Sequence, residues 1–133
     1  MSMPLAERLR LIVITDVELA LPRSLKSVVR AAVDAGAPAV QLRAKHMNAQ
    51  ELVAAGQELL PFVREAGALF FVNDRVDVAL AIEADGVHVG PDDVPVRVLR
   101  PVVPEGFLIG ASTHDPEEAR RLVKAGADYI GCG

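Results

Sequence analysis

The sequence has few aromatic residues, a single cysteine and no long apolar run. Aromatic residues make up 4% of the 133 residues and tryptophan is absent, so the core must consist mainly of Ala, Val, Leu and Ile. Cys132 cannot form an internal disulfide, which suits a reducing cytoplasm, and its strand-like neighbours predict a small buried side chain. No apolar run approaches the roughly 18 residues of a membrane span, and the N-terminus lacks a signal-peptide pattern.

Positive charge is also scarce. The chain has 14 Lys and Arg against 18 Asp and Glu, a net charge of −4, with no basic run. This balance argues against nucleic acid as a partner. The hydrophobic fraction is 51%, enough for one well-buried domain over residues 1–133. We therefore expect a cytoplasmic protein that binds neither nucleic acid nor membrane.

Short apolar runs alternate with segments of helical periodicity. Residues 1–8 are expected to form a loose lead-in and residues 17–23 a loop. Pro61 is expected to kink or divide its helix, because proline lacks the N–H donor and crowds the preceding turn. The predicted strands are 9–15, 39–42, 69–73, 87–89, 107–111 and one that begins at Tyr129; the predicted helices are 24–35, 48–66, 76–83, 96–102 and 116–125.

A glycine precedes each later strand at a regular spacing. Gly67, Gly86, Gly106 and Gly126 recur at intervals of 19 or 20 residues. A repeated helix–Gly–strand unit requires a parallel sheet with right-handed crossovers, and such short units favour a closed α/β barrel. A parallel (β/α)₈ TIM barrel needs about 200 residues or more. We therefore expect only the first six strands and five helices of a barrel, truncated on its C-terminal side; the alternative is an open doubly wound sheet.

Polar residues that could bind a phosphorylated ligand follow the second predicted strand. Gln41, Arg43 and Lys45 alternate, so they share one face if the extended backbone continues. Arg offers a planar fork to phosphate oxygens and Lys adds a mobile point charge. The alternative is a solvated rim.

Two acids follow the next two strands. Asp74, beside Asn73, and Asp93 would meet at one edge of a parallel sheet, and paired carboxylates with substrate phosphates are typical of Mg²⁺ sites. Either acid could instead cap the helix that follows it, and Asp92 is an alternative to Asp93. Ser112 could donate a hydrogen bond to a diphosphate, whereas His88, inside a strand, is expected to be a packed or hydrogen-bonded core residue.

Taken together, these pieces resemble the thiamine phosphate synthase family, a (β/α)₈-barrel transferase family. The pieces that carry the resemblance occur in family order over nearly the whole chain and are Val13-Ile14-Thr15-Asp16, Val40-Gln41-Leu42-Arg43-Ala44-Lys45, Asn73-Asp74-Arg75-Val76-Asp77, Ala84-Asp85-Gly86-Val87-His88-Val89-Gly90, Gly110-Ala111-Ser112-Thr113-His114 and Gly126-Ala127-Asp128-Tyr129-Ile130-Gly131. The most specific are Gln-x-Arg-x-Lys and Asn-Asp-Arg. Ala44 and Pro91 depart from the family pattern, which usually has Glu and Gln there.

The resemblance implies an enzyme of thiamine biosynthesis that joins 4-amino-2-methyl-5-hydroxymethylpyrimidine diphosphate to a thiazole phosphate and releases diphosphate. It assigns pyrimidine diphosphate binding to Gln41, Arg43, Lys45, Asn73 and Ser112, catalytic assistance to Arg43, Lys45 and Ser112, and Mg²⁺ to Asp74 and Asp93. The family's Thr-x-Thr-Lys segment and last two strands would lie beyond Gly133, so the 133-residue chain alone is expected to be inactive. Family barrels also suggest a homo-oligomer.

Two other functions compete with the synthase. Thiazole tautomerases share the barrel and use a histidine near His114, but tend to lose the Asn-Asp pair and the second acid. A non-catalytic barrel that binds a phosphorylated ligand is the other alternative. Asn73, Asp74 and Asp93 favour the synthase.

Overall fold

The computed structural model describes residues 3–133, which form one parallel β-sheet with helices along the crossovers. The six strands pair in chain order, β1-β2-β3-β4-β5-β6, and every pair is parallel. The strands are β1 (Val13–Ile14), β2 (Ala39–Leu42), β3 (Leu69–Asn73), β4 (Gly86–Val89), β5 (Leu108–Ser112) and β6 (Tyr129–Gly131). The helices are α1 (Leu5–Arg8), α2 (Val17–Ala20), α3 (Leu25–Asp34), α4 (Ala49–Glu65), α5 (Val76–Ala81), α6 (Val96–Leu99), the 3₁₀ turn η1 (Arg100–Val102) and α7 (Pro116–Ala125).

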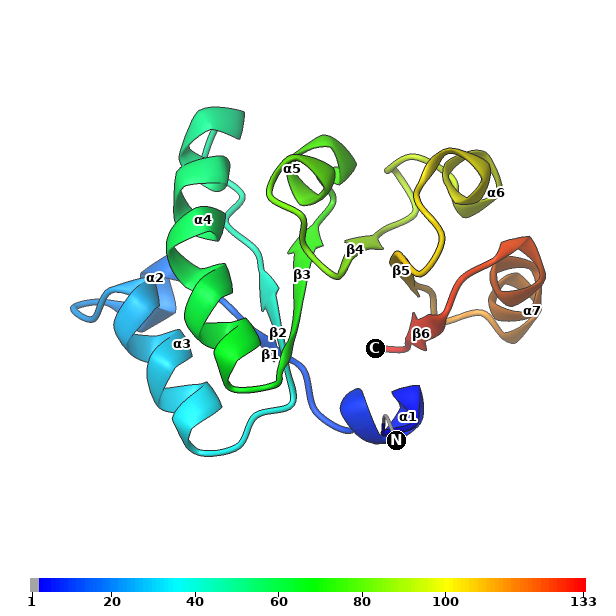
Figure 1. Cartoon of the computed structure of the whole chain (residues 1–133). Coiled ribbons are helices and arrows are strands. Elements are labelled where there is room, and N and C mark those ends of the chain that lie inside the picture. Colours follow the sequence, from blue (N-terminus) through cyan, green and yellow to red (C-terminus); the bar gives the residue numbers. More distant parts are fainter. Residues whose placement is uncertain (1–2) are drawn as a thin grey trace.

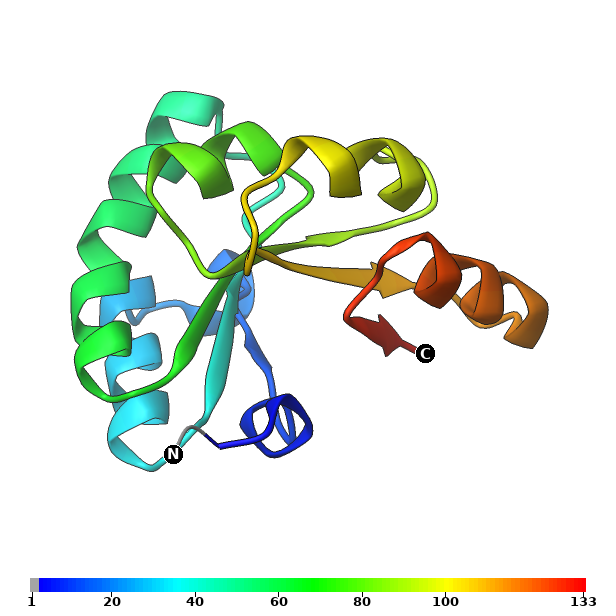
Figure 2. The same ribbon diagram turned by 45° about the vertical axis from the view of Figure 1, so that its right-hand side comes forward.

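The sheet curls into an open trough with α3, α4, α5, α6 and α7 around its convex side (Figures 1 and 2). This arrangement follows from right-handed crossovers between sequential parallel strands. The predicted parallel α/β sheet of six strands is confirmed, as part of a barrel-like fold. None of the helices in the described residues has the length and apolar character needed to span a membrane.

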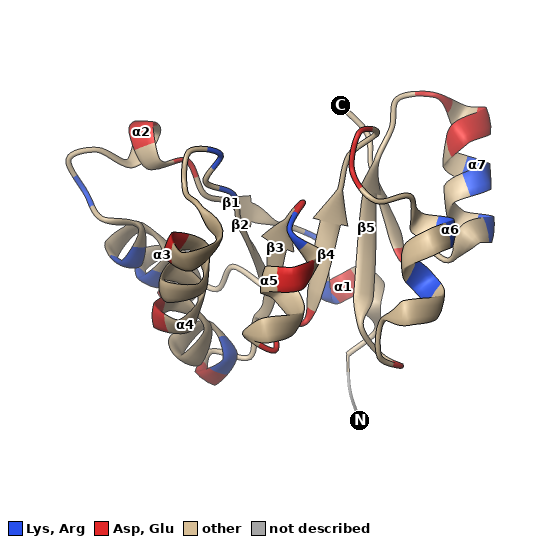
Figure 3. Ribbon diagram, turned by 90° about the horizontal axis from the view of Figure 1, so that it is seen from above, with Lys and Arg blue, Asp and Glu red and all other residues tan. Residues whose placement is uncertain are grey.

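Alternation along each strand divides the core into two layers. Val40, Val72, Val87 and Ile109 point outward into the large cluster between sheet and helices. On the inner face of the curled sheet, a smaller apolar cluster consists of Ala39, Leu69 and Phe71. Because both faces are covered over much of their length, the strands are uncharged, and charged residues lie on helices and loops (Figure 3).

The predicted helix boundaries hold where a cap fixes them. Asn48 and Glu51 form a capping box at the start of α4, and Asp115 accepts the Glu117 N–H before Pro116 opens α7. Gly126 ends α7 at φ 118°, a left-handed conformation that favours glycine.

An aspartate just before β4 and another just before β6 each accept a backbone N–H from the preceding strand. Asp85, just before β4, accepts the Phe70 N–H at 2.8 Å, and Asp128, just before β6, accepts the Ile109 N–H at 2.8 Å. Each aspartate also faces an arginine, Arg64 at 3.6 Å and Arg100 at 3.0 Å. The repeated residues before the strands therefore lock neighbouring units together at the amino end of the sheet.

Several predictions at the N-terminal end are wrong. The lead-in predicted over residues 1–8 contains α1; its residues 1 and 2 lie outside the described part. Leu5 of this helix, with Leu9, packs against the inner cluster at the start of the strands, on the concave side of the sheet (Figure 2). The predicted 9–15 strand shortens to Val13–Ile14, and the loop predicted over 17–23 contains α2, which Asp16 caps.

Two further predictions need correction. Of the two effects expected of Pro61, a kink or a division of the helix, division is not observed: α4 runs unbroken from Ala49 to Glu65 with Pro61 inside it. Cys132 is exposed rather than buried, since it lies just past Gly131, the last residue of the edge strand β6.

Candidate active site

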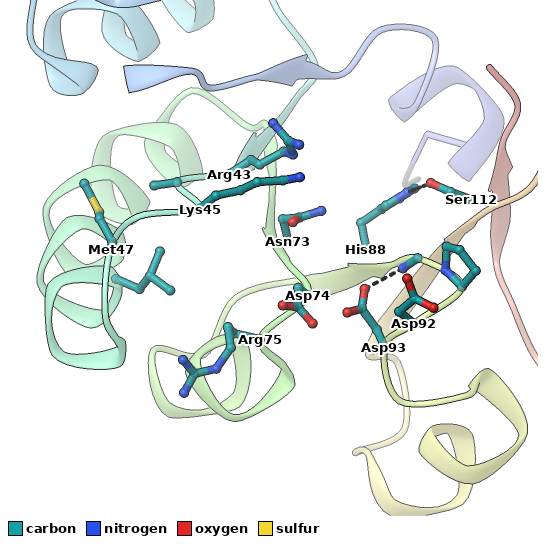
Figure 4. A pocket seen from close by; sticks show the side chains of 14 residues that line it. Arg43, Lys45, Met47, Asn73, Asp74, Arg75, His88, Asp92, Asp93 and Ser112 are labelled. Atoms are coloured by element: carbon teal, nitrogen blue, oxygen red, sulfur yellow. Dashed lines mark hydrogen bonds between the residues drawn. The ribbon is translucent and has the colours of Figure 1, made fainter. Parts of the chain in front are cut away.

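The carboxyl ends of the strands open onto one polar pocket of about 510 Å³. This is the edge at which parallel α/β sheets bind their ligands. The residues that line it are Arg43, Ala44, Lys45, Met47, Leu52, Asn73, Asp74, Arg75, His88, Gly90, Pro91, Asp92, Asp93 and Ser112. Six of the seven predicted site residues therefore lie around one cavity (Figure 4).

The two predicted cations line this pocket from the β2 side. Arg43 and Lys45 follow β2 and extend into the cavity (Figure 4). The backbone of Arg43 is fixed by the buried Thr15: its hydroxyl accepts the Arg43 N–H at 2.8 Å and donates to the Arg43 carbonyl at 2.9 Å. Thr15 thus fixes the backbone from which the Arg43 side chain extends. This role of Thr15 was not predicted from the sequence.

Gln41, the seventh predicted residue, is buried and lies behind Asn73. The Asn73 side-chain N–H donates to Gln41 Oε1 at 3.0 Å. Gln41 lines an adjoining cavity of about 820 Å³ on the inner face of the sheet, which Asn73 also lines. The Gln41 amide N–H groups and Asn73 Oδ1 remain available to a polar ligand at the junction of the two cavities.

The two predicted acids lie close together on the β3 and β4 side. Asp74 adopts φ 66° and donates its backbone N–H to the His88 carbonyl at 2.8 Å. Asp93 accepts the Gly90 N–H at 2.6 Å. The alternative capping roles are not observed: Arg75 and Pro95 occupy the N-cap positions of α5 and α6, and neither helix has a side-chain cap bond.

The proximity of these acids perturbs Asp74. Its pKa is raised to about 6, chiefly because its carboxyl shares a hydrogen bond with Asp93, with contributions from burial and the Asp93 charge. A non-glycine residue with φ near +60° is uncommon and concentrates at functional sites. The backbone here therefore holds two like charges together at some cost.

This donor set fits Mg²⁺. Two carboxylates are the protein share of a typical magnesium site, in which substrate phosphates and water complete the oxygen shell. Within residues 3–133 no group of three or more His, Cys, Asp or Glu could hold a metal ion unaided. Asp74 and Asp93 are thus suited to a metal that arrives with an anionic ligand.

Ser112 lies on the wall of the pocket and contacts His88. Its Oγ is 2.6 Å from His88 Nε2, and His88 Nδ1 is 2.9 Å from the Tyr129 hydroxyl. The prediction of a packed, hydrogen-bonded His88 is confirmed. Its two partners were missed, although the alternation of β4 and β5 places His88 and Ser112 on the same face.

Of the other polar residues near the acids, Asp92 lines the same pocket beside Asp93 (Figure 4), whereas Arg75, His114 and His46 are directed elsewhere. Arg75 is held by Asp77 through two hydrogen bonds of 3.0 and 2.7 Å and points away from the pocket centre (Figure 4). His114 is exposed and lines the adjoining inner cavity instead. His46 lies near Lys45 in a separate depression.

The chain is similar to known proteins of one family. The family model described as thiamine monophosphate synthase matches residues 11–133. The chain is 48% identical over 121 residues to the thiamine-phosphate synthase of Roseiflexus sp. (strain RS-1), covering 91% of this chain and 51% of that protein. It is 47% identical over 124 residues to the thiamine-phosphate synthase of Chloroflexus aurantiacus, covering 93% and 57%.

A solved structure agrees with these relatives. The thiamine phosphate pyrophosphorylase from Pyrococcus furiosus superposes with a TM-score of 0.91 at 45% identity, covering 98% of this chain and 62% of that one. This chain thus spans about half to three fifths of the relatives that it matches. With the family model covering residues 11–133 and this level of identity, the chain belongs to the thiamine monophosphate synthase family.

Proposed function

We propose that this chain supplies the diphosphate- and magnesium-binding part of a thiamine phosphate synthase. The whole protein would join the hydroxymethylpyrimidine diphosphate to the thiazole phosphate, releasing diphosphate. The observation that carries the proposal is one pocket with Arg43 and Lys45 on one side and Asp74 and Asp93 on the other. The names of the relatives support the same activity.

The residue roles follow from charge and hydrogen-bonding capacity. Arg43 and Lys45 would bind the diphosphate oxygens, and Ser112 would donate to the same group. Gln41 and Asn73, already bonded to each other, would present amide groups to the pyrimidine. Asp74 and Asp93 would hold Mg²⁺.

In the proposed reaction the C–O bond between the pyrimidine methylene and the diphosphate breaks, and the thiazole nitrogen forms a new C–N bond with that carbon. Negative charge develops on the departing diphosphate. Bound Mg²⁺ would stabilise that charge as a Lewis acid. Arg43, Lys45 and Ser112 line the same pocket, so they would stabilise the negative charge on the leaving group.

The proposal extends to the architecture of the whole protein. The curled six-stranded sheet matches part of a longer relative, and we infer that the full protein closes a single (β/α)₈ barrel. Its remaining strands would face the 820 Å³ inner cavity and supply the thiazole phosphate site. The tautomerase alternative receives less support, because Asn73, Asp74 and Asp93, which tautomerases tend to lose, all line the pocket.

Calorimetric titration of the 133-residue chain with the pyrimidine diphosphate, with and without Mg²⁺, tests the proposal. Magnesium-dependent binding is expected, and Asp74→Asn should abolish the magnesium dependence. Asp34→Asn, an exposed acid at the end of α3, is the matched control and should bind normally. A folded chain that binds nothing, or an Asp74→Asn variant that keeps the magnesium dependence, would refute the assignment.

A further inference from the structure

Three side chains from consecutive strands form a hydrogen-bonded chain that ends at the pocket. The Tyr129 hydroxyl on β6 lies 2.9 Å from His88 Nδ1 on β4, and His88 Nε2 lies 2.6 Å from Ser112 Oγ on β5. His88 and Ser112 both line the pocket that holds the two acids (Figure 4). Tyr129 lies behind them and lines the inner cavity.

Two glycines make room for this arrangement. Gly110 pairs in register with both His88 and Tyr129, and a Cβ at Gly110 would collide with the Tyr129 ring. A Cβ at Gly131 would lie 3.2 Å from His88 Cε1 and 3.6 Å from Ser112 Oγ. The Tyr129 ring also packs edge-on against Phe71, with centroids 5.5 Å apart. The rings are therefore fixed by packing on several sides.

The surroundings of the two rings set the direction of the hydrogen bonds. Burial raises the pKa of Tyr129, so the phenol keeps its proton at neutral pH. Among the described residues, His88 Nδ1 is the one hydrogen-bond partner of the Tyr129 hydroxyl. A phenol hydroxyl is a better donor than acceptor and an imidazole nitrogen is a strong acceptor, which favours donation from the Tyr129 hydroxyl to Nδ1. An imidazole that accepts at Nδ1 carries its proton on Nε2.

The position of the proton on His88 determines how the Ser112 hydroxyl can form hydrogen bonds. An Nε2–H that donates to Ser112 Oγ occupies one lone pair of the serine and prevents its hydroxyl hydrogen from pointing at His88. The Ser112 O–H is then free to point into the pocket. Without this constraint the serine could donate to the imidazole and turn a lone pair toward an anion, which would repel it.

We propose that Tyr129 and His88 are positioning residues that orient the Ser112 hydroxyl as a hydrogen-bond donor to the diphosphate of the ligand. This inference rests on the proposed function for the identity of the anion. The hydrogen bonds among the three residues are present whatever the identity of that anion.

The tautomer of His88 tests the direction without any ligand. The chain has three histidines, so long-range ¹H–¹⁵N correlation spectra of the wild type, His46→Gln and His114→Gln assign the His88 imidazole. The expected result is the neutral Nε2–H tautomer, shifting toward a tautomer mixture in Tyr129→Phe. A His88 ring protonated on Nδ1 at neutral pH would overturn the proposed direction of the hydrogen bonds.

Calorimetry with inorganic diphosphate and Mg²⁺ tests the consequence. Ser112→Ala should weaken binding about 10-fold to 100-fold, since hydrogen bonds to charged groups contribute about 1.5–3 kcal/mol. Tyr129→Phe, which keeps the ring, should weaken binding about 3-fold to 10-fold, the effect of about 1 kcal/mol. Ser27→Ala, an exposed hydroxyl deletion on α3, is the control for an unrelated change.

A double-mutant cycle separates orientation from general loosening of the fold. If Tyr129 acts through Ser112, the double variant Tyr129→Phe/Ser112→Ala binds no more weakly than Ser112→Ala alone. Additive losses would overturn the proposal. A folded wild type that binds no diphosphate would refute the proposed function and the anion named here. The tautomer spectrum tests the direction of the Tyr129–His88–Ser112 hydrogen bonds without any anion.

Discussion

Arg43 extends into the pocket from a backbone that a neighbouring side chain holds. Two hydrogen bonds with the Thr15 hydroxyl, one in each direction, fix this backbone. Arg43→Met should lower affinity for inorganic diphosphate in the presence of Mg²⁺ about 10-fold to 100-fold, because a charge-assisted bond is lost. The affinity of Arg43→Lys should lie between those of the wild type and Arg43→Met, since lysine keeps the charge and loses the planar fork.

Calorimetry measures this effect, with Lys26→Met, an exposed lysine on α3, as the control for a loss of one positive charge. Equal affinity of wild type and Arg43→Met for diphosphate would show that Arg43 does not bind this ligand.

Asp74 gives the site a defined pH dependence. Its pKa is raised to about 6 by Asp93, so the carboxyl must lose a proton before it can bind a cation. At pH 5 about one Asp74 in ten is ionised, and Mg²⁺ affinity through this group should be about tenfold weaker than at pH 7.5.

The same shift affects stability in a predictable direction. A carboxyl whose pKa is higher in the folded than in the unfolded chain favours the fold at low pH, and this contribution is lost as the pH rises through about 4 to 6. Asp74→Asn should therefore stabilise the metal-free chain at neutral pH and abolish stabilisation by Mg²⁺. Thermal unfolding at pH 5 and 7.5, with and without Mg²⁺, measures both effects; an unchanged magnesium response in Asp74→Asn would contradict the assignment.

At the scale of secondary-structure elements, the fit of β5 against β6 depends on a missing side chain. A Cβ at Gly110 would collide with the Tyr129 ring. Gly110→Ala should lower the free energy of unfolding by about 1–3 kcal/mol, the usual range for overpacking. Chemical denaturation measures this loss, and the additional change Tyr129→Ala should recover part of it; a fully stable Gly110→Ala would show that the strands can separate without cost.

At the scale of the whole molecule, the sheet has two open edges. Within residues 3–133, β1 and β6 each pair on one side only, and Ile14 of β1 is 55% exposed. Unpaired edge strands favour association with another chain. We predict that the 133-residue polypeptide self-associates as its concentration rises and that Ile14→Lys reduces the association.

Sedimentation velocity over a concentration series measures this tendency. Val123→Lys is the matched control, because Val123 is 56% exposed but lies on α7 rather than on a sheet edge. An equal effect of both substitutions would show that general surface hydrophobicity, and not the strand edge, drives association.

Local sequence patterns determined the elements whose signals are contained within a few residues. The boundaries of β2, β3 and α7 were predicted, as was the cap-defined start of α4, because apolar periodicity, N-caps and glycines act over one or two turns. The early segments were not predicted. α1 is a single turn, too short to be stable from local propensity, and its Leu5 packs against residues distant in the sequence.

The sequence by itself determined which chemical groups follow each strand: two cations after β2, an amide and an acid at the end of β3, another acid after β4 and a serine at the end of β5. Only the tertiary structure decided which of them touch. The Asp74–Asp93 pair that raises the pKa of Asp74, and the bonds that His88 forms across 24 positions to Ser112 and across 41 to Tyr129, require strands to lie in a particular register. That register is fixed by packing of the whole sheet, because a shift of one residue would turn every inward side chain outward.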